Sequence, residues 1–497
     1  MSPRRIAALP VDGRPAVREQ VQMLAALAGW QLAMPEVNQL GHLKRPADRQ
    51  QLADWLLAQA PHADGFVLSL DMLAYGGLVP SRFIPDTLAE LEAWLDLVPR
   101  LKAAAPGKPV YAFAATMRIS NNNVNQEEKD YWSEYGQLIW NWSYTTDQAN
   151  QLGASIEAAL AAAAAIPDAI RSDYLATRER NLQLTLRALD MAASGLIDRL
   201  VLPQDDTAEY GFNIAERRLL ERRIAELGLS GKVLVYPGAD EVMHTLCAHM
   251  VAAHSAEPPL SFYVHCSDPQ HVGSLRALYE DRPVLDAVAS QIAAAGARQV
   301  DSSAEADVIL AVHTRGGQQG DWAMRKPLPD PQPLASGWLE QLAAWHAQAK
   351  PVAVADLAYA NGGDPMLIAQ LPQALPLNTL AAYAAWNTAS NSIGSLVAQC
   401  VLARGRRHTA ANREVLALRL LEDVLYQSVL RQTVRTAIDE DACSAEHLRS
   451  LVELTYTSHA NAWASAQGLG WQVREVYLPW DRTFEIGLRL QAAEASA

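Results

Sequence analysis

Short apolar runs that alternate with helical stretches constrain the fold of this chain more than any other feature. Runs rich in Val, Ile, Leu and Ala recur along most of its length, and amphipathic stretches separate them. This alternation is typical of parallel strands that crossover helices bury on both faces. The expected strands lie at residues 5–12, 65–71, 110–118, 199–206, 232–241, 260–268, 307–314, 351–362 and 380–387. The sequence therefore predicts an α/β protein.

The chain length of 497 residues is enough for several domains or for one large barrel with additions. We expect a (β/α)8-like barrel or two stacked parallel α/β halves, with a C-terminal helical region. Residues 1–255 form the N-terminal half in this prediction, residues 256–400 the second half that completes the rim, and residues 401–497 the mainly helical region.

The charge balance favours a small partner. The net charge is −14, and the one basic patch, within residues 404–408, holds only four basic residues. Nucleic-acid binding needs a larger basic surface, so we expect a small-molecule or glycan substrate and no nucleic acid. The oligomeric state stays open at this stage.

Cysteine usage and hydropathy predict a cytoplasmic protein. The four cysteines are far apart and form no Cys-x-x-Cys pair, which favours reduced thiols over a disulfide framework or a zinc ribbon. The apolar stretch after the N-terminal arginines is too short for a secretory signal. The longest apolar stretch, 154–167, falls short of the roughly 20 residues that span a bilayer. We therefore expect no export and no membrane anchor.

Most expected strands end in a polar residue. These residues are Asp12, Asp71, Arg118, Asp205, Asp240, His265, His313 and Asp356. Because the carboxyl ends of parallel strands open on one side of a sheet, we expect them to converge on one rim. Helix N-capping accounts for about half of them, since strand-to-helix loops favour Asp, Ser, Thr and Asn. It does not account for the arginine or the histidines.

Asp205 and Asp206 are the expected catalytic residues. One N-cap needs one side chain, so capping leaves the second aspartate without a role. Adjacent residues at a strand end point to opposite sides, and such a pair can divide its work between a protonated acid and an ionised group.

The loops around this rim supply the expected substrate-binding residues. They are Asp12, Arg14, Asp71, Tyr75, Arg118, Tyr210, Asn213, Asp240, His313, Asp356, Asn361, Trp386 and Asn387. The aromatic-rich stretch 131–144 suits either a sugar subsite or a helix that packs its rings into the core. Trp386 and Asn387 suit either a ring-shaped polar ligand or the cap of a helix.

Several common catalytic motifs are missing from the sequence. It contains no Gly-x-Gly-x-x-Gly, no Gly-x-x-x-x-Gly-Lys-Ser/Thr, no Gly-x-Ser-x-Gly and no His-Glu-x-x-His. Dinucleotide, nucleotide triphosphate, serine-hydrolase and zincin chemistry therefore lose their best markers. We expect no cofactor and no metal.

Seven segments together resemble the bacterial family catalogued as domain of unknown function 4127. They are "LPVDGRP", "LSLDMLAYGGLVPSR", "MRISNNNVNQEEKDYWSEYG", "LPQDDTAEYGFN", "YPGADEV", "ADLAYANGGDP" and "AYAAWNTASNSIG", and they cover most of the chain up to about residue 400. The resemblance implies a family and no particular activity.

The leading functional hypothesis is a glycoside hydrolase. Tandem acidic residues at the end of the fourth barrel strand resemble those of substrate-assisted N-acetylhexosaminidases, in which the substrate's acetamido oxygen is the nucleophile. In this scheme Asp205 orients the acetamido group and Asp206 protonates the leaving oxygen.

Two alternatives stay open. One is a metal-dependent hydrolase of an amide or cyclic substrate. It would use some of Asp12, Asp71, Asp205, His313 and Asp356. The other is a non-catalytic carbohydrate-binding protein, whose rim recognises a sugar without turning it over.

Overall fold

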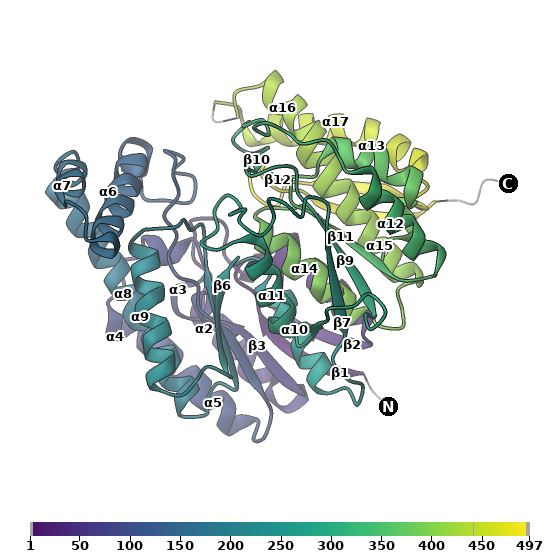
Figure 1. Ribbon diagram of the computed structural model, residues 1–497. Helices are drawn as coiled ribbons and strands as arrows, with labels where there is room; N and C mark the ends of the chain where they lie inside the picture. Colours follow the sequence, from purple (N-terminus) through teal and green to yellow (C-terminus); the bar gives the residue numbers. More distant parts are fainter. Residues whose placement is uncertain (1–2, 441, 494–497) are drawn as a thin grey trace. The chain divides into compact units, whose positions relative to one another are not determined.

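The computed structural model describes residues 3–440 and 442–493, and the chain forms two compact units (Figure 1). The first unit consists of Met1–Gly13, Trp30–Leu246 and Tyr279–Asp281. The second consists of Arg14–Gly29, Cys247–Leu278 and Arg282–Ala497. The three expected segments 1–255, 256–400 and 401–497 stay a prediction.

A six-stranded parallel sheet forms the centre of the first unit, in the order β2-β1-β3-β4-β5-β6. Its strands are β1 (Arg4–Leu9), β2 (Trp30–Ala33), β3 (Gly65–Ser69), β4 (Val110–Phe113), β5 (Arg199–Gln204) and β6 (Val233–Pro237). Most residues in these strands are buried, as expected for strands that helices cover on both faces.

Eight α-helices belong to the described part of the first unit. They are α2 (Arg49–Gln59), α3 (Leu70–Tyr75), α4 (Leu88–Leu95), α5 (Leu97–Ala104), α6 (Trp132–Leu152), α7 (Glu157–Ala164), α8 (Asp168–Ala193) and α9 (Phe212–Glu226). Three 3-10 turns accompany them, η2 (Val37–Gln39), η3 (Ala60–His62) and η4 (Pro80–Arg82). Helices α6 and α7 follow β4 and precede β5 in the sequence. They pack against each other, as Figure 1 shows.

A five-stranded parallel sheet forms the centre of the second unit, in the order β13-β11-β9-β7-β8. Its strands are β7 (Ser261–Cys266), β8 (Arg298–Gln299), β9 (Val308–His313), β11 (Val352–Asp356) and β13 (Ala382–Ala384). Two short pairs lie outside this sheet: β10 (Gly320–Asp321) with β12 (Tyr359–Ala360), and the antiparallel β14 (Trp471–Tyr477) with β15 (Gly487–Ala492).

The helices of the second unit come from both ends of the chain. They are η1 (Pro15–Val17), α1 (Glu19–Leu27), α11 (Val284–Ala294), α12 (Ser336–Ala347), α13 (Pro365–Ala374), η5 (Leu377–Thr379), α14 (Ala389–Leu402), α15 (Ala410–Arg419), the π-helical η6 (Leu420–Leu430), α16 (Arg431–Ala437) and α17 (Ala445–Ala466). Helix α10 (Val242–Ala253) begins in the first unit and ends in the second.

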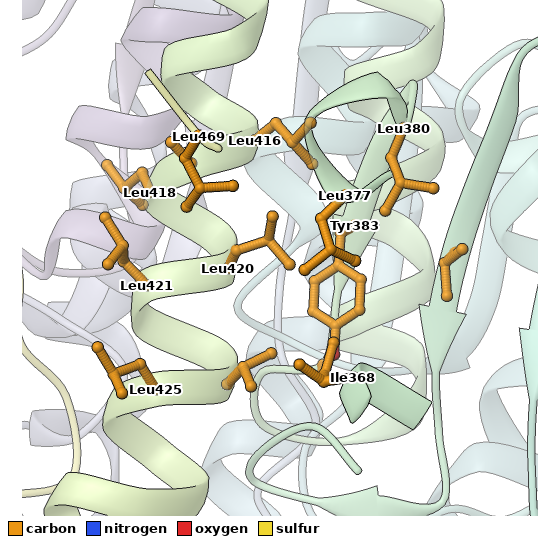
Figure 2. Packing of buried hydrophobic residues seen from close by; sticks show 14 of the residues in the cluster. Ile368, Leu377, Leu380, Tyr383, Leu416, Leu418, Leu420, Leu421, Leu425 and Leu469 are labelled. Carbon is orange, nitrogen blue, oxygen red and sulfur yellow. The ribbon is translucent and has the colours of Figure 1, made fainter. Parts of the chain in front are cut away.

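The core of the second unit joins its sheet to the C-terminal helices. Figure 2 shows Leu420 of η6 on the side that faces Tyr383 of β13 and Ile368 of α13, and Leu421 and Leu425 on the opposite side of the same helix, within one buried cluster. Leu448 of α17 belongs to the same buried cluster. The region after residue 400 therefore shares a core with the second sheet, and it adds the β14–β15 hairpin to the expected helices.

The two sheets repeat one topology. In each, the second strand in sequence lies at an edge, the first lies next to it, and the later strands follow on the other side of the first. Open α/β sheets bind ligands at the carboxyl ends of the strands, where the order reverses. This point lies between β1 and β3 in the first unit and between β7 and β9 in the second.

The structure confirms the α/β class with parallel sheets and shows two separate sheets in place of a closed barrel. All nine expected strands exist. In the two large sheets the sequence pattern missed β2 and β8, which are short edge strands, and outside them it missed β10, β14 and β15. The expected single rim is therefore divided between the sheets, and Asp205 follows the fifth strand of the chain and not the fourth. Among the described residues, no helix is long and apolar enough to cross a membrane.

Candidate active site

The acidic pair lies at the carboxyl end of β5, beside the end of β4. Gln204, the last residue of β5, donates a hydrogen bond from Nε2 to Thr116 Oγ1 at 2.9 Å, which ties the two strand ends together. Asp206 then adopts a φ of 25°, in the left-handed region that few side-chain-bearing residues enter. This turn directs Asp205 and Asp206 to different partners.

Asp205 binds a buried arginine. Arg82 Nη2 lies 2.9 Å from Asp205 Oδ2, and its Nη1 lies 3.3 Å from Glu127 Oε2 and 3.2 Å from Glu128 Oε1. The Arg82 side chain is 1% exposed. One guanidinium group therefore serves three carboxylates from two different loops.

Asp206 binds a second arginine and a hydroxyl group. Ser120 Oγ donates a hydrogen bond to Asp206 Oδ2 at 2.7 Å, and Arg118 Nη1 lies 3.4 Å from the same oxygen. Arg118 also lies 3.1 Å from Glu127 and 2.7 Å from Glu128. The acidic pair is thus part of one network in which four carboxylates share two guanidinium groups.

This excess of carboxylates has an electrostatic consequence. Burial raises the pKa of Asp205 to about 7, and the charge of Asp206 acts in the same direction, while Arg82 and Arg118 oppose both. The positive charge of Arg82 lowers the pKa of Asp205 only in part, because Glu127 and Glu128 also pair with this arginine. Asp205 can therefore carry a proton near neutral pH, which is the property of a general acid.

The side chains of the network differ in their access to solvent. Asp205, Asp206, Glu127 and Arg118 have exposed fractions of 16%, 20%, 14% and 17%. Arg82, by contrast, lies beneath them. Solvent therefore reaches the two aspartates and Glu127, while Arg82, which binds Asp205 and Glu127, is buried.

The neighbouring strand ends add further polar groups. Asp71 follows β3, and its Oδ2 accepts a hydrogen bond from the backbone N–H of Ala115 at 2.9 Å. Burial raises the pKa of Asp71 to about 7, and burial followed by the charge of Asp71 raises the pKa of Tyr75 as well. Asp12, after β1, is also buried, and Asp240, after β6, raises the pKa of Asp205.

Asn213 and Tyr210 lie near the pair but in supporting positions. Asn213 Nδ2 donates a hydrogen bond to the backbone oxygen of Asp206 at 3.5 Å. The Tyr210 ring meets the Tyr144 ring edge-on, with 5.5 Å between centroids. Of the aromatic stretch 131–144, Trp132 is buried in a cluster with Tyr174, so core packing explains that ring.

The remaining expected residues belong to the second unit. His313, at the end of β9, lies 3.1 Å from Ser267 Oγ through Nδ1 and 3.0 Å from Asp364 Oδ2 through Nε2. Asp356, at the end of β11, accepts hydrogen bonds from the Tyr383 hydroxyl at 2.8 Å and from the backbone N–H of Asp364 at 2.7 Å. Burial raises the pKa of Asp356 to about 6, against the charge of His313.

Three more expected residues also lie near the carboxyl edge of the second sheet. The backbone N–H of Asn361 donates to the backbone oxygen of Asn387 at 2.8 Å, and both residues have a positive φ. Trp386 is 4% exposed. Arg14, also in the second unit, lies over the Trp480 ring at 4.9 Å. These residues form contacts within their own unit.

Sequence reasoning missed four members of the network: Arg82, Ser120, Glu127 and Glu128. None of them ends a strand. Arg82 belongs to the short turn η4, and the other three lie in the loop between β4 and α6. The available signal was chemical: an aspartate pair of like charge at a buried strand end needs cations, and the loops after β3 and β4 each hold an arginine.

In residues 3–440 and 442–493 no group of three or more His, Cys, Asp or Glu side chains has the arrangement of a metal site. The four cysteines are free thiols.

The fold and the network define an α/β protein with two parallel-sheet units and a carboxylate–arginine site at the edge of one sheet. The chain belongs to the family described as protein of unknown function (DUF4127), whose match covers residues 6–489. The sequence resemblance to this family is thereby confirmed, and it extends well beyond residue 400.

Other comparisons add little. No curated protein matches the chain. Among solved structures, the chain is aligned with a UDP-glucosyltransferase from Polygonum tinctorium, described as capable of glucosylating indoxyl and bound to 3,4-dichloroaniline, at 9% identity over 84% of this chain and 94% of that one. The TM-score is 0.19, which is too low for the match to bear on fold or function.

Proposed function

We propose that the protein is a glycoside hydrolase in which Asp205 is the general acid. The observation that carries this proposal is a partly exposed carboxyl group whose pKa is raised to about 7 beside a second carboxylate. Glycosidases use such a pair: one carboxyl group protonates the leaving oxygen while another stays ionised near the developing positive charge.

The roles within the pair are exchanged relative to the scheme expected from the sequence. Asp206 accepts a hydrogen bond from Ser120 and forms an ion pair with Arg118, and these two contacts fix its orientation. Asp205 shares its arginine with two other carboxylates. Asp205 is therefore the better proton donor, and Asp206 is the better group to orient the sugar or stabilise its charge.

The test is hydrolysis of a panel of aryl and alkyl glycosides, with N-acetylhexosaminides included. We expect Asp205→Asn to lower kcat/KM by about 100-fold or more on alkyl glycosides, whose leaving oxygen needs a proton. The loss on nitrophenyl glycosides is expected to be much smaller, because nitrophenolate leaves without protonation. This difference between leaving groups is specific to a general acid.

Asp198→Asn is the matched control, because Asp198 lies before β5 and pairs with Lys102 far from the network along the strand. It is expected to retain wild-type kinetics on both classes of glycoside. Inactivity of the wild type across the whole panel would refute the proposal. A stoichiometric transition metal in the active protein would favour the metal-dependent hydrolase instead, and glycan binding without turnover would favour a binding protein.

We also propose a cytoplasmic location. The four free cysteines support it, since reduced thiols are typical of that compartment.

A further inference from the structure

Glu127 stands out among the network carboxylates because it contacts both arginines and still reaches solvent. Its Oε2 lies 3.3 Å from Arg82 Nη1 and 3.1 Å from Arg118 Nη1, and its side chain is 14% exposed. Glu128 contacts the same two arginines, but its side chain is 3% exposed. Of these two adjacent glutamates, Glu127 is the one that a substrate can touch.

The arginines also fix the spacing between Glu127 and the proposed acid. Asp205 and Glu127 bind different nitrogens of the same Arg82 guanidinium, at 2.9 and 3.3 Å. Two carboxylates on one guanidinium group lie roughly 5 to 8 Å apart, which includes the separation of acid and nucleophile in retaining glycosidases. No other network carboxylate shares Arg82 with Asp205 and is as exposed.

We propose that Glu127 is the enzymatic nucleophile, a role that rests on the proposed glycosidase function. Two guanidinium groups on one carboxylate favour its charged form. This suits a nucleophile, which attacks as a carboxylate and leaves again as one, better than a general base, which must take up a proton. The site then has its own nucleophile, and the substrate needs no acetamido group.

The reaction balances with these two residues. Glu127 attacks the anomeric carbon and forms an ester, the bond from that carbon to the leaving oxygen breaks, and the Asp205 proton moves to that oxygen. Water then attacks the same carbon, the ester bond breaks, and Asp205 takes a proton from the water. Ser120 and Arg118 hold Asp206 in place throughout.

The experiment uses a 5-fluoroglycosyl fluoride of whichever sugar the wild-type protein releases from the aryl glycoside panel. Such a probe forms the ester quickly and hydrolyses it slowly, so the adduct accumulates. We expect peptide mass spectrometry of the full-length protein to find one sugar on Glu127. This readout needs no variant and so does not depend on how a substitution folds.

Variants provide the second readout. Glu127→Gln is expected to lose labelling and about 1000-fold or more in kcat, and azide is expected to restore turnover in Glu127→Ala. Glu134→Gln, an exposed position in the first turn of α6, is the matched control and is expected to label like the wild type.

The outcomes separate this inference from the proposed function. Turnover of the panel with the sugar on Asp206, or with no adduct at all, would overturn the role of Glu127 and leave the glycosidase intact. Turnover restricted to N-acetylhexosaminides without an adduct would return the nucleophile to the substrate. No turnover of any glycoside would end both.

Discussion

The four carboxylates of the network share the positive charge of two arginines. Two arginines serve Asp205, Asp206, Glu127 and Glu128, so no carboxylate has a cation to itself. Removing any one member redistributes the remaining charge among the others. The pKa of Asp205 therefore depends on the charges of its neighbours. This dependence can be measured without any substrate.

Asp206→Asn is expected to lower the pKa of Asp205. The substitution removes the adjacent negative charge and leaves Arg118 to fewer carboxylates, and both changes favour ionised Asp205. The measurement is a carboxyl-carbon NMR titration of the protein labelled at aspartate, with Asp205→Asn to assign the signal. We expect a midpoint about one pH unit below that of the wild type. An unchanged or higher midpoint would show that Asp206 does not govern Asp205.

Arg82→Met is expected to destabilise the protein by about 3 to 5 kcal/mol, because it removes the buried one of the two cations that four carboxylates share and leaves Asp205 without its ion-pair partner. The loss should be smaller at pH 5 than at pH 8, since protonation relieves the unpaired charge. Urea unfolding at both pH values measures it. Arg171→Met, which removes an ion pair with the largely exposed Asp168, is the control, and about 0.5 kcal/mol is expected there. Equal losses of unfolding free energy in Arg82→Met and Arg171→Met would contradict the expectation that a buried ion pair costs more to break than an exposed one.

Among the elements, the strands were predictable and the turns that carry the site were not. The apolar runs predicted β5, which ends at Gln204 directly before Asp205, because burial on both faces requires a continuous apolar strand. The edge strand β2 was missed because it alternates buried and exposed residues over only four positions. Arg82 was missed because its turn, η4, reaches Asp205 across a sequence distance of 123 residues, which no local pattern encodes.

Gly76 is the C-cap of helix α3. The chain turns at this residue into the loop that leads to Arg82. Gly76 has a φ of 77°, and a Cβ there would lie 2.8 Å from Ala47 N and from Pro46 Cβ. Gly107 has a φ of 74° and open space around such a Cβ. The two glycines therefore have nearly the same φ angle and differ in what an added Cβ would contact.

Gly76→Ala is therefore expected to cost more than Gly107→Ala. Gly107→Ala should cost only the strain of a side chain at positive φ, about 1 kcal/mol. Gly76→Ala adds a clash with backbone atoms and should cost roughly 2 kcal/mol more. Urea unfolding of the two variants gives the difference. Equal costs would show that the loop after α3 can move away, and that it does not hold the position of Arg82 firmly.

At the scale of the whole molecule, the sequence predicted the α/β class but could not decide between a barrel and two sheets. Local patterns specify strands, while closure depends on which strands become edges, such as β2 and β6. For the same reason, the sequence could not show that the expected rim residues belong to two different sheets. Asp205 and His313 both end parallel strands, and their assignment to different sheets follows from pairing partners that lie far away in the sequence.

Both units contain carboxyl groups whose pKa is raised by burial, so that they keep their protons at a higher pH than exposed carboxyl groups do. Burial raises the pKa of Asp71 and Asp205 to about 7 in the first unit, and of Asp356, Asp423 and Glu422 to about 6, 6 and 8 in the second. In the unfolded chain these groups lose their protons near pH 4. Between about pH 4 and pH 8 these groups therefore bind more protons in the folded protein than in the unfolded chain.

The free energy of unfolding is accordingly expected to fall as the pH rises through this window, by on the order of 1 kcal/mol per pH unit for each of these groups that is protonated in the folded protein and ionised in the unfolded chain. Carboxylates whose pKa is lowered, such as Asp364, act below about pH 4 and do not offset the trend. Urea unfolding at pH 5, 6, 7 and 8 measures it. Glu422→Gln, which replaces one such group by an uncharged side chain beside Gln20, should make the slope less steep, because Glu422 no longer has to ionise inside the fold. Stability that rises from pH 5 to pH 8 would mean that these carboxyl groups are charged in the folded protein, and Asp205 would then lose its standing as an acid at neutral pH.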